Sequence, residues 1–190
     1  FYNQYVTSWE SGQVYGITNP DKTVVERLWG ANLPLTVSGS GGPWGYGGMT
    51  GAGNANGYVR AEFTTLPYSD GTIDSDSPTA IKEFRYDKNG NVTAIMQYDW
   101  VPRCSVPRSG TNCMGHVTGL PSSGLTLKRK TVSIYYNQAS DADSASSNSN
   151  SYADPASPKL KNVLKATEIQ DGNGVPVSRS EFFYDDPNER

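Results

Sequence analysis

The sequence is short of the residues from which metal and catalytic sites are usually built. Its 190 residues include one histidine, His116, and two cysteines. Because a structural zinc ion takes four such ligands, these three side chains leave the metal one ligand short. The phosphate-binding glycine patterns and the G-x-S-x-G elbow of serine hydrolases are also missing. We therefore predict no metal, no cofactor and no enzyme activity, with His116 as the one candidate for a catalytic base.

The chain also lacks a long apolar run and a large excess of charge of either sign. No stretch approaches the roughly 20 apolar residues that a membrane-spanning helix needs. The 16 basic and 19 acidic residues leave a net charge of -3, which gives no general attraction to nucleic acid. We expect neither a membrane span nor a nucleic-acid partner.

Glycine, proline and tyrosine are plentiful instead, with 20, 12 and 12 copies. Turn formers separated by β-branched and aromatic residues are typical of many short strands. Few leucine, alanine or glutamate residues follow a helical spacing. The composition therefore predicts an all-β fold, an antiparallel sheet of hairpins whose core depends on aromatic side chains.

We expect the whole chain, residues 1–190, to form a single β module with long glycine-rich and Ser/Asn-rich loops. Its successive parts are N-terminal strands (1–37), a glycine-rich loop (38–57), hairpins (58–136), a flexible polar loop (137–158) and a C-terminal hairpin (159–190). The chain begins at Phe1 rather than at a methionine and ends directly after a repeat-like element. We therefore expect it to be part of something longer.

The clearest hairpin signal lies in residues 80–99, around Lys88-Asn89-Gly90. A three-residue loop puts Gly90 where a type I turn with a G1 bulge needs a left-handed residue. It also collects the apolar groups on one face, opposing Tyr86 to Val92, Phe84 to Ala94 and Lys82 to Met96. A two-residue loop would oppose Tyr86 to Thr93 and Arg85 to Ala94, which mixes charged and apolar partners. We favour the three-residue loop.

A second hairpin is predicted around Gly172-Asn173-Gly174, where the same loop length opposes Ile169 to Val177. The segment E-F-x-Y-D occurs at 83–87 and again at 181–185, which suggests an internal repeat. Its glutamates, Glu83 and Glu181, are predicted on solvent-facing positions of their strands.

These segments resemble the repeat motif of RHS (rearrangement hotspot) or YD-repeat proteins, a Tyr-Asp pair, a short Gly-Asn turn and a β-branched residue. The residues that carry the resemblance are Tyr86, Asp87, Gly90, Asn91, Tyr98, Asp99, Tyr184 and Asp185. The resemblance implies an antiparallel sheet that winds as a spiral, closing in large members into a shell around a toxin. It also implies that neighbouring repeats are the main partners.

Our leading hypothesis is a non-catalytic module of a secreted or cell-surface bacterial RHS-type protein, a shell, stalk or scaffold that is toxin-associated in some members. One alternative is a subunit of an extracellular filament that grows by β-strand addition, with Phe1–Trp9 as the donated strand. A second is a glycan-binding or adhesive module that uses Trp44, Tyr46 or Trp100.

Two smaller features concern loops. Cys104 and Cys113 stand nine residues apart in a Ser/Asn/Gly-rich context, which favours a local disulfide over two reduced thiols. Asp70, Asp74 and Asp76 could meet at a cation, but their spacing departs from a calcium loop, so we favour a polar turn.

Overall fold

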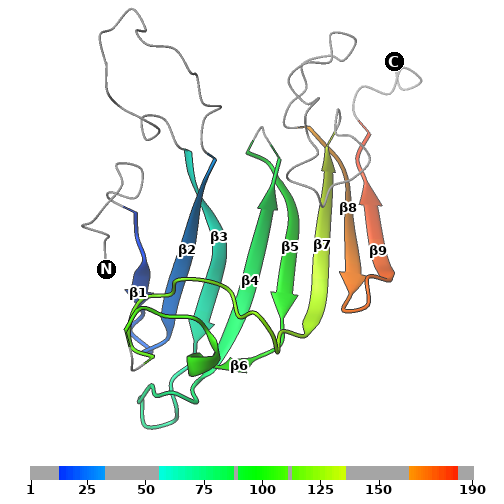
Figure 1. Ribbon diagram of the computed structural model, residues 1–190. Helices are drawn as coiled ribbons and strands as arrows, with labels where there is room; N and C mark the ends of the chain where they lie inside the picture. Colours follow the sequence, from blue (N-terminus) through cyan, green and yellow to red (C-terminus); the bar gives the residue numbers. More distant parts are fainter. Residues whose placement is uncertain (1–12, 33–55, 88–89, 111–112, 136–162, 184–190) are drawn as a thin grey trace, which may run out of the picture. The chain divides into compact units, whose positions relative to one another are not determined.

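The computed structural model describes residues 13–32, 56–87, 90–110, 113–135 and 163–183. Within these ranges the protein is all-β, as predicted, and the paired strands run antiparallel (Figure 1). The strands are β1 (Gly16–Thr18), β2 (Val24–Asn32), β3 (Asn56–Thr65), β4 (Pro78–Tyr86), β5 (Val92–Tyr98), β6 (Val101–Pro102), β7 (Leu127–Tyr135), β8 (Leu164–Asp171) and β9 (Pro176–Glu181). A single turn of 3₁₀ helix, η1 (Arg103–Ser105), follows β6.

Most strands lie where the turn formers and β-branched residues predict them. The glycine-rich loop is the exception at its end, because Asn56 and Gly57 already belong to β3, where they pair with Asn32 and Ala31. The rest of that loop, the N-terminal segment 1–12 and the polar loop 137–158 lie outside the described residues. So do Trp44, Tyr46, Tyr184 and Asp185.

The chain divides into two compact units. Unit 1 comprises residues 1–79 and 101–121, and unit 2 comprises residues 80–100 and 122–190. In unit 1, β2 pairs with β1 and β3, while β6 pairs with the first two residues of β4. In unit 2, the strands pair in the order β4, β5, β7, β8, β9.

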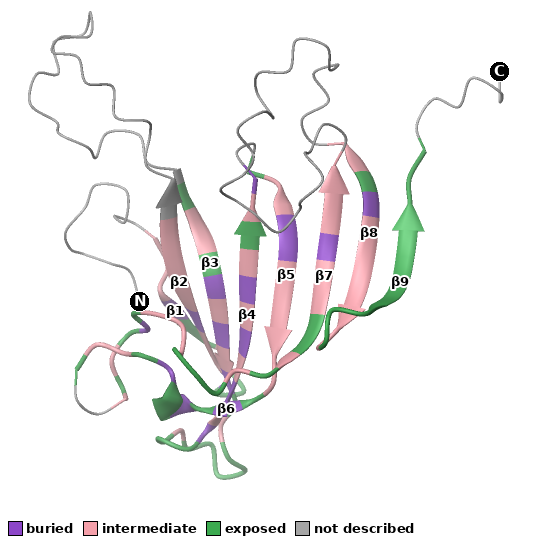
Figure 2. Cartoon of the chain, turned by 45° about the vertical axis from the view of Figure 1, so that its right-hand side comes forward, coloured by how far each residue is buried: buried purple, intermediate pink, exposed green. Residues whose placement is uncertain are grey.

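Among the described residues, polar or charged side chains are buried as often as hydrophobic ones, and three of the buried hydrophobic ones are alanines. On β3 the buried residues alternate at Ala61, Phe63 and Thr65, as expected for a strand with one covered face. In unit 2 the central strands β5, β7 and β8 contribute Ala94, Val132 and Ala166 (Figure 2). Within the described ranges, Phe63 is the one fully buried aromatic side chain, so the aromatic core that the composition predicted is small there.

Four turns in the described residues share one hydrogen-bond pattern. The residue before a three-residue loop donates its N–H to the residue after the loop, and the third loop residue donates back. The flanking pairs are Asn19/Thr23, Tyr68/Thr72, Asp87/Asn91 and Asp171/Val175. The third loop residues have φ of 68° (Lys22), 81° (Gly71), 83° (Gly90) and 80° (Gly174). The three-residue loop with a left-handed Gly90 is confirmed.

The predicted register of the first hairpin is right at the turn and wrong beyond it. Tyr86 opposes Val92 as expected, but a bulge follows between Arg85 and Tyr86, with Thr93 as the additional residue on β5. Beyond the bulge, Phe84 opposes Ile95 instead of Ala94, and Lys82 opposes Gln97 instead of Met96. A bulge places two residues opposite one, so it shifts every later pair by one position.

The second hairpin departs from its predicted register in the same way. Gln170 opposes Pro176, and a bulge between Ile169 and Gln170 then moves Ile169 opposite Ser178 instead of Val177. In both hairpins the bulge lies directly after the first strand pair next to the turn. That pair is Tyr86/Val92 in one hairpin and Gln170/Pro176 in the other. The two hairpins therefore share loop length, left-handed glycine and bulge position.

Candidate functional site

The repeat motif contains an aspartate that closes each hairpin turn. The Asp87 carboxylate accepts the backbone N–H of Asn91 at 2.9 Å and its side-chain amide at 2.8 Å. The Asp171 carboxylate accepts the N–H groups of Asn173 and Val175, both at 2.9 Å. These bonds lower the pKa of Asp171, because they favour the ionised carboxylate. An aspartate followed by a three-residue glycine turn is thus the shared element.

That equivalence changes which residues correspond between the two copies. Asp87 corresponds to Asp171, which the sequence comparison overlooked because it aligned the E-F-x-Y-D letters. In that alignment, Glu83 lies on β4, the first strand of its hairpin, whereas Glu181 ends β9, the second strand. A search for an aspartate three residues before a glycine would have found the pair.

The prediction that Glu83 faces solvent is wrong, whereas Glu181 is exposed as expected. The Glu83 carboxylate accepts the hydroxyl of Tyr98 at 2.9 Å and pairs with Arg85 at 2.9 Å. Burial, together with the hydrogen bond to Glu83, raises the pKa of Tyr98 to about 12. A buried carboxylate needs such partners, so the β5 tyrosine of the motif satisfies a charge on β4.

Other motif residues also make contacts within unit 2. Asp99 pairs with Lys128 at the start of β7, and the Tyr86 ring lies 6.5 Å from that of Phe84. Trp100, one of the predicted glycan-binding residues, is half exposed.

Strand β9 is exposed at every residue, and within the part of the chain described it pairs with β8 alone (Figure 2). Four of the nine large exposed apolar side chains of the described residues lie on it or beside it, namely Val175, Val177, Phe182 and Phe183. A strand this poorly covered is the natural place for a further strand to pair.

The predicted disulfide between Cys104 and Cys113 is confirmed, with 5.1 Å between the two Cα atoms. It lies within residues 103–118 of unit 1, which begin with η1 and are called the disulfide loop below. Within this segment Arg108 and Val117 form an isolated antiparallel bridge, and Val106 and Val117 are buried. The loop therefore packs against its own unit, with Cys104 on the exposed side.

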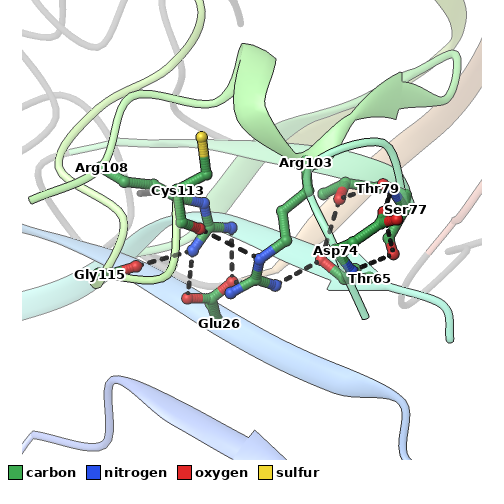
Figure 3. A network of polar contacts seen from close by, with 9 residues as sticks. All are labelled: Glu26, Thr65, Asp74, Ser77, Thr79, Arg103, Arg108, Cys113 and Gly115. Atoms are coloured by element: carbon green, nitrogen blue, oxygen red, sulfur yellow. Dashed lines mark hydrogen bonds and ion pairs between the residues drawn. The ribbon is translucent and has the colours of Figure 1, made fainter. Parts of the chain in front are cut away.

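Two arginines of this loop segment meet one glutamate of β2 (Figure 3). The two terminal nitrogens of Arg108 donate hydrogen bonds to the two carboxylate oxygens of Glu26, at 2.7 Å and 2.6 Å. Arg103 reaches the same carboxylate at a longer 3.3 Å. The three side chains are at most 10% exposed, so the group is a buried charge cluster with two positive charges and one negative.

The remaining donors of this cluster are largely satisfied by backbone and hydroxyl groups. Arg108 donates to the carbonyl of Gly115 at 2.9 Å, while Arg103 donates to the carbonyl of Cys113 at 3.3 Å and to the Thr65 hydroxyl at 3.1 Å. The Nε of Arg108 is buried without a hydrogen-bond partner. Sequence reasoning missed this cluster.

Two of the three aspartates considered for calcium, Asp70 and Asp74, act as turn acceptors. Asp70 accepts the N–H and hydroxyl of Thr72, at 2.9 Å and 2.7 Å. Asp74 accepts the N–H groups of Asp76 and Ser77, at 2.9 Å and 3.0 Å. This is the arrangement of a polar turn, and residues 70–77 belong to the described ranges, in which no trio of metal-binding side chains is found.

His116 is exposed and lies in the disulfide loop, where its partner Ser109 is partly covered. Its Nδ1 is 2.8 Å from the hydroxyl of Ser109, and its ring packs edge-on against Tyr15 at 5.8 Å. In a catalytic triad the serine bonds Nε2, and Nδ1 is occupied by the orienting acid. This pair has the serine on the other nitrogen, and the absence of catalysis stays a prediction.

Comparison of the chain with protein-family models, with curated proteins and with solved structures finds no match in any of the three. The fold itself defines an all-β protein with two hairpins of the same construction and one disulfide. Within the described ranges, no helix has the length and apolar character needed to cross a bilayer.

Proposed function

We propose that this chain is a non-catalytic structural module of a secreted or cell-surface protein built from β-hairpin repeats, similar to RHS/YD-repeat proteins. Its role would be that of a shell, stalk or scaffold, and its partners would be neighbouring repeats. The observation that carries the proposal is the shared construction of the hairpins β4–β5 and β8–β9.

The likeness of the two hairpins extends beyond their sequences. Each has an aspartate before the turn, a glycine with positive φ as third loop residue and a bulge directly afterwards. A one-residue bulge in the same place on both hairpins is a specific feature, because bulges set how strongly a strand bends and twists. Bulges in matching places would bend the two hairpins alike, and a regularly winding sheet requires such regular bends.

The exposure of β9 supports the idea that the array continues. In repeat proteins each unit buries its apolar face against the next, so a last unit without a cap keeps that face open. Val177 is 69% exposed and Phe183 is 80% exposed. A further antiparallel strand on β9 would cover such side chains and use the outer backbone groups of the strand.

The extracellular setting is supported by the disulfide. Disulfides persist in oxidising compartments and are rare in the cytosol. Both cysteines of the chain are used in the one bond, and no free thiol remains.

The exposed β9 edge also favours a second candidate, a filament subunit that adds copies of itself strand by strand. Sedimentation velocity over a wide concentration range separates the two. A repeat module should stop at a dimer, in which two β9 edges pair, whereas a filament subunit should grow without limit. A monomer at every concentration would contradict both.

Val177→Lys tests whether the association uses β9, because a lysine on an edge strand opposes pairing. We expect the variant to be monomeric. Leu66→Lys is the matched control, since Leu66 is an exposed apolar residue of unit 1, and its association should equal that of the unmodified protein.

A further inference from the structure

A cavity of about 400 Å³ lies in unit 1 beside the buried charge cluster. Arg103 and Glu26 form its charged wall, and Ile17, Val24 and Met114 are its aliphatic side chains. The other lining residues are Tyr15, Gly16, Thr18, Gly115 and His116. Its volume is in the range of sites for small organic molecules. Ile17 and Met114 are exposed, which leaves this side of the cavity accessible from solvent.

The charge balance at this wall is uneven. Arg108 uses both terminal nitrogens on Glu26 at 2.6–2.7 Å, so the glutamate is already neutralised by a bidentate partner. Arg103 has only the longer 3.3 Å contact to the same carboxylate. Two buried cations and one anion leave one positive charge without a counter-ion in the cluster.

Arg103, which lines the cavity, has donor capacity left. Its Nε and Nη1 have partners in Cys113, Thr65 and Glu26, while among the described residues no hydrogen bond involves Nη2. Burial and the repulsion from Arg108 lower the pKa of Arg103, and the attraction of Glu26 only partly opposes them. A buried charge is costly without a full complement of partners.

We propose that this cavity binds a small organic monoanion, a carboxylate with a short apolar body, whose charged end pairs with Arg103. A single negative charge matches the single excess positive charge. The apolar side chains Ile17, Val24 and Met114 favour a hydrocarbon body over inorganic phosphate or sulfate. This site is independent of the hairpin repeats of unit 2.

Isothermal titration calorimetry with benzoate, at constant chloride, is the test. We expect one saturable site in the millimolar range or tighter, and binding of the neutral isostere benzamide at least about tenfold weaker. Amide chemical shifts of Gly115 and His116, which line the cavity, should move with benzoate.

Ile17→Glu places a carboxylate at the accessible side of the cavity and should weaken benzoate by at least about tenfold. Ile17→Gln is its neutral control and should retain binding. Because Ile17 is exposed, neither variant should impair folding. Arg103→Gln should abolish binding, with Arg60→Gln, an exposed arginine of β3, as control.

Three results would each overturn the proposal. One is equal affinity for benzoate and benzamide, and another is equal affinity of the Ile17→Glu and Ile17→Gln variants. The third is no saturable binding to the folded protein. Each leaves the proposed role of the hairpins untouched, because the sedimentation experiment reports on β9 alone.

Discussion

The Glu26 carboxylate and the Arg108 guanidinium form a bidentate, buried pair although 82 residues separate them in the chain. They join the first part of β2 to the disulfide loop. The pair is a long-range contact between two buried charges. The stability of the protein should therefore respond strongly to substitutions of either residue.

Removing the negative partner should destabilise the protein more than any surface charge change. Glu26→Gln leaves two buried arginines without a counter-ion, and we expect a loss of about 3–5 kcal/mol in the free energy of unfolding. Denaturant titration measures it. The control is Glu62→Gln, which breaks the partly exposed 3.5 Å pair with Arg27 and should change stability by about 0–1 kcal/mol. Similar values for the two variants would show that the Glu26 cluster is not a stabilising contact.

The disulfide should stabilise by restricting the unfolded chain. Replacing both Cys104 and Cys113 by serine opens a short loop, for which the chain-entropy relation gives about 2–3 kcal/mol. Hydrogen exchange should then accelerate at Ser109 and Thr118, whose amides bond within the loop at 2.9 Å. Unchanged exchange at these two amides would mean that the bridge does not hold the loop.

Lys22 occupies the position that glycine takes in the other three turns of this type, with φ of 68°. A side chain in the left-handed region is strained, and glycine is not. Lys22→Gly should therefore raise the free energy of unfolding by about 0.5–1 kcal/mol after the entropy of glycine is taken into account. Lys22→Ala removes the same charge but keeps the Cβ atom, so it should bring no gain. Equal effects of both substitutions would contradict the explanation by backbone strain.

Alkaline pH should weaken unit 2 through Tyr98. Its pKa rises from 10.0 to about 12 in the folded protein, so the unfolded chain loses the phenol proton first as pH increases. The stabilisation is complete below pH 10 and is lost as pH rises toward about 12. Tyr98→Phe should make the alkaline fall in stability shallower. Equal slopes of the two proteins between these pH values would exclude this origin.

The turns and the disulfide could be predicted from the sequence because both are local. A glycine at the third position of a short loop, and two cysteines nine residues apart, restrict the backbone within one segment. The register beyond the turns could not be predicted from apolar matching, since the bulge depends on how the whole strand twists. Phe84 opposite Ile95 and Ile169 opposite Ser178 are the result.

The charge cluster was missed because its members are far apart and follow no motif. One signal was available in β2, where Val24, Glu26 and Leu28 share a strand face by the period of two. A glutamate between two aliphatic residues on one face indicates a buried carboxylate that needs a cation. Sequence alone does not say which of 16 basic residues supplies it.

The hairpins β4–β5 and β8–β9 share loop length, left-handed glycine and bulge position, and matched substitutions at their turn glycines test the proposed repeat most directly. Gly90 and Gly174 have φ of 83° and 80°, and an added Cβ meets no atom within 4 Å at either position. Gly90→Ala and Gly174→Ala change only the backbone preference, and each should lower the free energy of unfolding by about 1–2 kcal/mol. Equal losses in denaturant titration are the predicted result. A loss at one glycine without a loss at the other would contradict the repeat.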